Sequence, residues 1–487
     1  MRVTLDRFAA RCENLALVVP RIAVLGAPRA PRDTGNQPRA LPGYRERSPW
    51  LVCAVISLLV GVEPARAQEP YNVTVNVTEL SRIFTELYGP GGLVVNSQSA
   101  LAGGISHSAH FNSAFESEFS QFGTALTAQI VSLPLPAPAS GFTYEFDPSL
   151  GVFTRSTSTF GPILAERADT IGARRVSFGF AYQRLAFDSI EGMDLQSIPA
   201  VFTHDNAELR GGREDVITTV NAIDSEVSRS AGFITYGVTN TLDVSVAIPY
   251  IAADIVVTSD ATVRRIGTTI PEIHFFRAAD DSIGDRRLFT AFGHASGIGD
   301  IAVRMKQVIK KGQVHGFALG LDLRLPTGDE RNLLGTGAPG VQPFAAWSAD
   351  FGVVSPHINL GYQWNGSSIL AGDLDAGIAA DLPDVGVYAL GAVVAVHPRV
   401  TVALDVLGRY IIDTSRVRRE DFHALDGRSV FPNIAFESGD INELSSAVGL
   451  KINLAGRLLL NANLLASLND GGLRDKISPL VGIEYAF

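Results

Sequence analysis

The chain has 487 residues, of which 18% are charged and 47 are glycine, and its formal net charge at pH 7 is −10. The charged share lies below the roughly 25% that is usual in soluble domains. An acidic chain lacks the basic surface that nucleic acid binding requires, so we expect no nucleic acid partner. Low charge with abundant glycine suits a protein whose outer surface meets lipid, and the alternative is an ordinary β-rich secreted protein.

Residues 1–67 are predicted to be an N-terminal extension followed by a cleaved signal peptide. Arg45 and Arg47 precede a short apolar run at 50–60, and the small residues of Ala65-Arg-Ala67 follow it. This order is typical of a secretory signal, with cleavage after Ala67. The apolar run is too short for a membrane-spanning helix, which needs about 20 residues. Both cysteines lie in this part, so the exported chain would have no thiol for a disulfide, a metal site or a nucleophile.

Residues 68–172 are predicted to form a partly helical plug or periplasmic region. Thr78–Tyr88 has the composition of a short helix that ends at Gly89-Pro90. Further on, aromatic and aliphatic residues recur at spacings of three and four, which predicts an apolar stripe along one face of a helix. The stripe consists of Phe111, Phe115, Phe119, Phe122, Leu126, Ile130 and Leu133. We expect this helix to plug the mouth of a barrel. A small hairpin is predicted at 141–155.

From residue 173 to 487 the pattern changes to a period of two. Leu242, Val244, Val246, Ile248 and Tyr250, for example, alternate with small or polar residues. Since successive side chains of a strand point to opposite faces, each such segment has an apolar face and a polar face. We predict twelve strands, at 174–187, 227–238, 241–252, 299–309, 314–326, 342–351, 354–365, 385–396, 400–413, 444–454, 457–468 and 478–487.

The connections between these strands alternate in length. Short turns fall near 239–240, 310–313, 352–353, 397–399 and 455–456, and long polar joints fall between them. Short periplasmic turns opposite long extracellular loops are the rule for outer-membrane barrels. The fold class is therefore all-β, a transmembrane antiparallel up-and-down β-barrel of about 12 strands. Fourteen strands are the alternative, if the 141–155 hairpin joins the wall.

The last strand, Ser478–Phe487, ends the chain on an aromatic residue. Tyr485 and Phe487 close its apolar face, as expected for the interfacial girdle of a membrane barrel. A terminal Phe also resembles the closing strand of bacterial outer-membrane proteins. That resemblance implies recognition of Phe487 by the barrel assembly machinery, with outer-membrane lipid as the surrounding partner.

Charged residues also occur on the polar face of the strands, where we expect the lumen. Two interpretations stay open: a wall of mixed charge that tunes passage, or charges that neutralise one another to hold the barrel together. Both require opposite charges near each other, because an unpaired charge out of water is costly. These lumen-lining candidates are Asp243, Arg304, Lys306, Asp322, Arg324, Asp405, Arg409, Lys451 and Glu484.

Evidence for catalysis is weak in this sequence. The nine histidines are scattered, and we interpret His315, His357 and His397 as strand-end residues of the surface or girdle. Ser355 beside His357 is the only local pairing of a nucleophile with a base. The acidic run 280–285 has oxygen ligands suitable for Ca²⁺, although a solvated loop explains it better. We therefore predict no enzyme, no cofactor and no metal site.

Two segments resemble a known family. Leu325-Pro-Thr-Gly-Asp-Glu-x-Asn-Leu-Leu-Gly-Thr-Gly337, with Pro356-His-x-Asn-Leu-Gly-Tyr362, is similar to the outer-membrane "transporter" family named for the meta-pathway of phenol degradation. The stretch 160–172, Phe-Gly-Pro-Ile-Leu-Ala-Glu-Arg-Ala-x-Thr-Ile-Gly, resembles the same family. The resemblance covers roughly 111–487. It implies an outer-membrane barrel related to channels for hydrophobic compounds such as fatty acids and toluene.

Two functions are consistent with these features. The first is an outer-membrane channel through which small hydrophobic or aromatic solutes diffuse passively. The second is a barrel that transports nothing, either a structural surface protein or an enzyme that modifies lipids at its rim. Uptake of a sparingly soluble aromatic compound distinguishes the two.

Overall fold

The computed structural model describes residues 72–89, 93, 95, 144–147, 152–155, 159–206, 211–267, 273–277, 282–374 and 376–487. The chain divides into two compact units, Met1–Ala67 and Gln68–Phe487, and every described residue belongs to the second. Among the described residues, no helix combines the length and apolar character needed to cross a membrane. The predicted Phe111–Phe122 helix lies outside the described residues.

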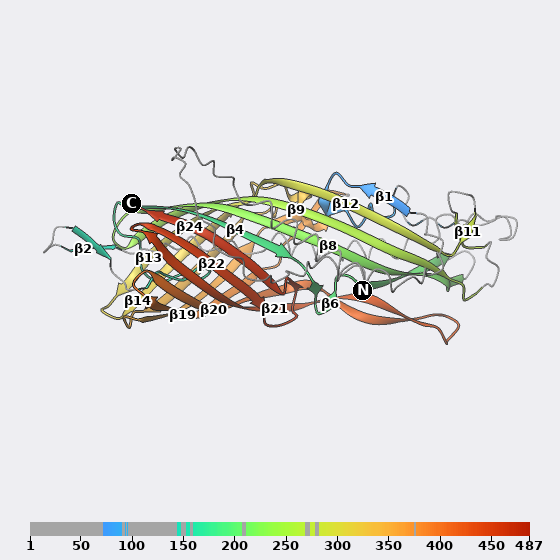
Figure 1. The fold of residues 1–487 in the computed structure, drawn as a ribbon. Coiled ribbons are helices and arrows are strands. Elements are labelled where there is room, and N and C mark those ends of the chain that lie inside the picture. Colours follow the sequence, from blue (N-terminus) through green and yellow to red (C-terminus); the bar gives the residue numbers. More distant parts are fainter. Residues whose placement is uncertain are drawn as a thin grey trace, which may run out of the picture. The chain divides into compact units, whose positions relative to one another are not determined.

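Twelve antiparallel strands close into a barrel (Figure 1), which confirms the predicted up-and-down architecture. Each strand of the wall pairs with the wall strand that follows it in the chain, and the last one pairs with the first to close the ring. The strands are β4 (Val176–Ala186), β8 (Gly211–Gly237), β9 (Leu242–Arg264), β13 (Ile301–Lys311), β14 (His315–Leu325), β15 (Gly340–Ala349), β16 (Val354–Asn365), β19 (Val385–His397), β20 (Val400–His423), β21 (Val430–Ala455), β22 (Leu458–Ser467) and β24 (Ile477–Ala486).

The predicted hairpin near 141–155 is confirmed as β2 (Tyr144–Asp147) paired with β3 (Val152–Arg155). It forms a sheet of its own and does not join the wall. The fourteen-strand alternative is therefore wrong, and the wall has twelve strands.

The strands of the wall carry apolar side chains on their outer face. On β24, Val481, Ile483 and Tyr485 are 49%, 41% and 38% exposed, whereas the side chains between them are buried. The same alternation recurs around the ring, with exposed Phe, Leu, Ile, Val, Tyr and Trp residues on most wall strands. The outer surface of the ring is therefore an apolar belt.

Four strands of the wall are much longer than predicted. The expected ends at 227, 252, 413 and 444 are wrong, because β8, β9, β20 and β21 continue through segments that we had interpreted as long polar joints. The far half of β8 pairs with β7 (Ile198–Asn206), and the far half of β9 pairs with β12 (Arg286–Ile298). Finally β1 (Asn72–Asn76) runs parallel to β12.

We call this second part the extension: β1, β7, β12, the far halves of β8 (211–227) and β9 (251–264), and the far hairpin of β20 and β21 (412–441). The hairpin meets β7 where the amide of Val201 donates to the Asn433 side chain, at 3.0 Å. A single hydrophobic core runs through the extension. It includes Ile223, Ile255, Val257, Val417 and Ile434, each at most 3% exposed.

Residues 77–89, with Leu93 and Val95, fill much of this core. Leu80, Ile83 and Leu87 are at most 1% exposed, and the Tyr88 ring packs edge-on against Phe202 and Phe289. The predicted helix at Thr78–Tyr88 is wrong: one 3₁₀ turn, η1 (Leu80–Arg82), is followed by further turns. A helix of this length is marginal alone, so tertiary packing decides its conformation.

Short elements lie in the connections between the longer strands. They are β5 (Ser189–Ile190) and β6 (Met193–Asp194) with β23 (Leu473–Arg474), β10 (Phe276–Arg277) with β11 (Ile283–Gly284), β17 (Ser367–Asp373) with β18 (Ile378–Asp381), and η2 (Glu330–Asn332). In η2, Asp329 caps the turn by accepting from the amide of Arg331. Asn332 then accepts from the amide of Leu80, which ties η2 to η1.

Candidate functional site in the barrel lumen

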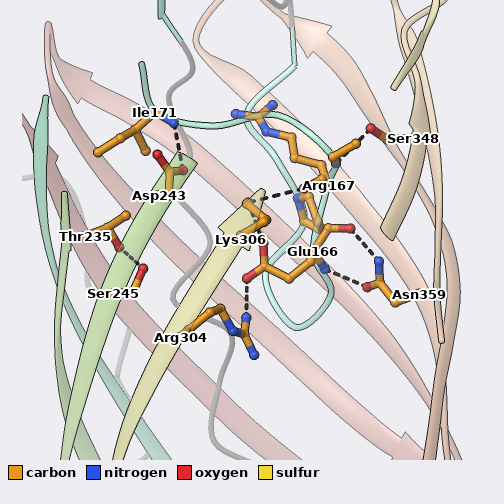
Figure 2. Close-up of polar contacts among 12 residues, drawn as sticks. Glu166, Arg167, Ile171, Thr235, Asp243, Ser245, Arg304, Lys306, Ser348 and Asn359 are labelled. Carbon is orange, nitrogen blue, oxygen red and sulfur yellow. Dashed lines mark hydrogen bonds and ion pairs between the residues drawn. The ribbon is translucent and has the colours of Figure 1, made fainter. Parts of the chain in front are cut away.

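A segment without helix or strand, Thr159–Gly172, occupies the inside of the barrel near its short-turn end; we call it the plug (Figure 2). Except for Leu164 and Asp169, which are half-buried, its residues are buried. The plug contains the 160–172 motif that resembles the phenol-degradation family. Its proline, glycine and alanine residues give no periodic pattern, so its backbone polar groups need partners on the wall.

Side chains of the wall supply those partners from several sides. The amide of Phe160 donates to Thr401 Oγ1 at 3.1 Å, and the amide of Ala168 donates to Ser348 Oγ at 3.1 Å. The Asn359 side chain binds both backbone groups of Glu166, at 2.7 and 2.8 Å. The plug is therefore fixed to β15, β16 and β20 by directed hydrogen bonds.

Four of the lumen-lining candidates also hold the plug. The Glu166 carboxylate contacts Lys306 Nζ at 2.9 Å and also pairs with Arg304, and Figure 2 shows both cations pointing toward it. Lys451 Nζ donates to the carbonyl of Pro162 at 2.8 Å. Asp243 accepts from the amide of Ile171 at 3.0 Å. These charges come from β9, β13 and β21. Strand β21 lies beside β20, and β9 and β13 attach the plug to a further side of the ring.

The five remaining candidates have other partners. Arg304 also forms an ion pair with Asp322. Asp405 bonds His357, and Glu484 accepts from Ser177 on β4. The other two are Arg324, which donates to Asn365, and Arg409, which pairs with Glu443 at 2.9 Å. The structure thus brings the candidates together in two groups, one around the plug and one farther toward the long-loop end.

A cavity of about 340 Å³ lies between the plug and the long-loop end. Leu164–Glu166 of the plug form one boundary, and Phe187, Leu334 and Leu473 lie on the side of the extension. This volume is at the lower end of the range for small-molecule sites. The wall between is a mixture of apolar side chains and charged ones. The charged ones are Arg229, Arg304, Arg324, Arg409, Arg474, Glu166, Asp300, Asp322, Glu443 and Asp475.

Sequence reasoning missed several of these residues. Glu443 lies one residue before the start that we predicted for its strand, and Arg229 lies on the inward parity of β8, where it was overlooked. Glu166 lies in an irregular segment and Arg474 lies in a very short strand, and in neither place does a periodic pattern mark the inner face. For Glu166 a signal existed, because it belongs to the 160–172 family motif.

His357 is also placed differently from our prediction of a surface or girdle residue. Its ring is 1% exposed, and its Nε2 lies 2.7 Å from the Asp405 carboxylate. A Cβ added at Gly391 would collide with Asp405 and would lie 2.7 Å from His357, so glycine is needed for this close approach. Ser355 hydrogen-bonds Thr159 of the plug instead. Ser355 and His357 therefore line a small cavity of about 70 Å³ between the wall and the plug.

A second buried ion pair lies in the extension, outside the apolar belt. His274 Nδ1 is 2.7 Å from Asp215, whose other oxygen accepts from the amides of Ile266 and Gly267. Burial alone would raise the pKa of Asp215, but His274 and the two amides hold that pKa below its usual value. No group of three or more potential metal ligands occurs among the described residues.

The class of protein follows from these features. The strands form a closed antiparallel ring with an apolar outer belt and a polar, charged interior. Short turns lie at one end of the ring and long connections at the other. This is the architecture of outer-membrane β-barrels.

Comparison with known families finds one match. The family model described as "Putative MetA-pathway of phenol degradation" matches residues 211–390, which confirms the resemblance seen in the sequence. No curated protein matches the sequence.

Several solved structures are similar to parts of the chain. They include an outer membrane channel from Pseudomonas putida F1 (TM-score 0.39, 11% identity, covering 66% of this chain and 98% of that one). The NanC porin has a TM-score of 0.29 at 10% identity and covers 64% and 99%. A FadL homologue from Pseudomonas aeruginosa has a TM-score of 0.27 at 10% identity and covers 64% and 89%. At these scores the likenesses carry no argument about function.

Proposed function

We propose that the protein is an outer-membrane channel through which small hydrophobic or aromatic solutes diffuse passively. The observation that carries this proposal is the lumen cavity of about 340 Å³, lined by both apolar and charged side chains. Its apolar lining, with Phe187, Ile251, Phe344 and Leu465 among its members, suits a solute with an apolar body. The description of the matching family, phenol degradation, supports an aromatic solute.

The location in the outer membrane rests on the apolar belt and the predicted signal peptide. Exposed aromatic rings, including Phe178, Tyr485 and Phe487, gather where the first and last wall strands meet at the short-turn end. Tyrosine and phenylalanine at this level form the interfacial girdle of membrane barrels. We propose that the exported chain begins after Ala67 and that the short turns face the periplasm.

Passage requires the plug to move or to leave a path beside it. The plug closes the lumen at the short-turn end through polar contacts, with Glu166, Lys306 and Asn359 central to them. It also makes apolar contacts, in which Phe160 packs on Leu459 and Ala486. Polar contacts of this kind exchange with water more readily than a packed hydrophobic core. The plug is therefore the element that we expect to control flux.

No observation favours the enzymatic alternative. Ser355 and His357 line a cavity of only about 70 Å³ beside the plug, which is too small for a lipid ester, and Ser355 bonds Thr159 rather than His357 in the contacts described. A nucleophile and its base must be within hydrogen-bond reach of each other and of substrate. We therefore propose a channel without hydrolytic activity.

Uptake by cells tests the proposed function. Bacteria lacking the gene, and the same cells complemented with it, are given radiolabelled phenol at low concentration, and initial uptake is measured. The proposal predicts faster uptake in the complemented cells, and faster uptake still when Glu166→Gln weakens the attachment of the plug. Equal uptake with and without the protein, at confirmed surface expression, would contradict it.

A further inference from the structure

The cavity holds a cluster of arginines that the proposed function does not require. Arg229, Arg324, Arg409 and Arg474 all line it. The charge of Arg409 acts on each of the other three, so each of them lies within electrostatic range of Arg409. Like charges inside a protein repel one another, and such a cluster is costly unless anions compensate it.

Carboxylates near the cluster compensate it only in part. Arg409 is paired with Glu443. Asp300 lies 3.8 Å from Arg324, but its oxygens also accept from the amides of Gly328 and Thr336 and from the Thr336 hydroxyl. Asp475 is engaged in the same way by the amides of Ala186 and Ile477 and by the hydroxyl of Ser478.

Arg474 is the clearest case. It is 7% exposed, and it donates to the Leu444 carbonyl, to Asn469 and, at 3.5 Å, to Ser445, which are all neutral acceptors. Its Nε is buried without a hydrogen-bond acceptor, and so is the Nε of Arg324. The carboxylates of Glu443, Asp470 and Glu191 act on Arg474 electrostatically. Glu443 and Glu191 form their ion pairs with Arg409 and Arg416 instead. The Nε–H groups of Arg324 and Arg474 are therefore two buried donors beside one cavity that lack an acceptor.

The surroundings of these donors are apolar on one side. Leu185, Phe187, Leu465 and Leu473 line the same cavity. A solute that satisfies both features has an apolar body and a single anionic head. Arginine suits such a head because its fixed fork of N–H donors binds carboxylate or sulfonate oxygens with charge-assisted hydrogen bonds.

We propose that the lumen cavity is a binding site for small organic monoanions with an apolar body, held at the head by Arg324, Arg409 and Arg474. This inference rests on the proposed channel function and narrows it from hydrophobic solutes in general to amphipathic anions. Neutral hydrocarbons would leave the arginine donors without an acceptor and would bind less well.

The test uses two probes of similar shape and opposite permanent charge, benzenesulfonate and benzyltrimethylammonium. Binding of each to the purified full-length protein is measured by calorimetry, and influx of each is measured in proteoliposomes. We expect binding of benzenesulfonate only, and faster influx of benzenesulfonate than of benzyltrimethylammonium. The double variant Arg324→Gln/Arg474→Gln should weaken benzenesulfonate binding about tenfold or more, since two charge-assisted hydrogen bonds are lost.

Two further variants keep the test decisive. Arg324→Lys/Arg474→Lys preserves the charge and should recover part of the binding, whereas Arg428→Gln removes an exposed cation of the β20–β21 hairpin and should leave binding unchanged. Equal binding of both probes, or undiminished binding in a folded double glutamine variant, would overturn the anion site. Phenol uptake by cells decides the channel separately, so a missing anion site with normal phenol uptake refutes only this inference.

Discussion

Strands β8 and β9 pass through two regions with opposite polarity. In the barrel half of β9, Ile248 points outward and is 45% exposed, while the inward Asp243 and Ser245 are buried among polar groups. In the extension half of the same strand, the inward Ile255 and Val257 are at most 1% exposed and belong to a hydrophobic core, while Asp254 and Asp260 face outward and pair with His294 and Arg286. The inversion falls near Ile251.

The difference shows which solvent each region meets. A soluble sheet packs its apolar face inward and turns its polar face to water, whereas a membrane barrel does the reverse. Both arrangements occur here along one continuous strand, so the strand leaves lipid where its polarity inverts. The barrel is stabilised by hydrogen bonds between neighbouring strands and by charges around the plug. The extension is stabilised by burial of apolar side chains.

The largest effect should come from a charge placed in the core of the extension. Val257 is fully buried, so Val257→Asp should cost about 4 kcal/mol or more, because an unpaired carboxylate would be buried. Its neighbour Val256 is 38% exposed on the outer face, and Val256→Asp should change little. Hydrogen exchange of β12 amides measures both, and equal effects would contradict the assignment of faces.

The next effect concerns the plug. Glu166→Gln leaves Lys306, a buried residue, without its carboxylate partner, which should cost about 3 kcal/mol. The plug should detach locally, and the conductance of single channels in planar bilayers should rise. Asp421→Asn, which removes an exposed carboxylate near the tip of β20, is the control. Unchanged conductance and unchanged exchange of plug amides in the Glu166 variant would refute this role.

A charge on the apolar belt should have a smaller effect. Leu390 is 58% exposed on the outer face of β19, and Leu390→Arg should cost about 2–3 kcal/mol in a bilayer. Gln342 lines the cavity opposite Asp322 on the neighbouring strand, so Gln342→Arg should be tolerated. Denaturant titrations in lipid compare the free energy of unfolding of the two variants. A tolerated Leu390→Arg would place the outer face of β19 in water.

The smallest effect is a pH dependence in the extension. Because the pKa of Asp215 is lowered in the folded state, its contribution is present above the ordinary value of 3.8 and is lost as pH falls through the folded-state pKa. Asp215→Asn should therefore reduce the stability of the extension by about 1 kcal/mol at pH 6, and the difference from the unmodified protein should shrink below pH 3.8. A difference that grows in acid would contradict this.

The same comparison explains what the sequence could predict. All twelve wall strands were predictable, because each alternates between an apolar outer face and a polar inner face and every second connection is a short turn. The extension was missed because its alternation has the opposite sense: Asp254 and Asp260 on the outer face of β9 looked like a polar loop. Alternation alone does not say which face meets lipid.

The site was only partly predictable. The charges on wall strands, such as Arg304 and Lys306, follow from parity, but the residue that joins them, Glu166, lies in a segment without periodicity. Irregular segments are ordered by contacts with residues distant in sequence, here Asn359 and Ser348, and a local pattern cannot show these. The 160–172 motif is the segment seen inside the barrel, whereas the predicted Phe-striped helix lies outside the described residues and stays a prediction.

Labelling of single cysteines in lipid tests the inversion most directly. In a chain with Cys12→Ser and Cys53→Ser, cysteine is introduced on the outer face at Ile234 or Ile248 in the barrel half, and at Asp224 or Thr258 in the extension half. A membrane-impermeant maleimide should label the second pair rapidly and leave the first pair unlabelled. Rapid labelling of Ile234→Cys and Ile248→Cys in folded protein within bilayers would contradict a lipid-facing barrel.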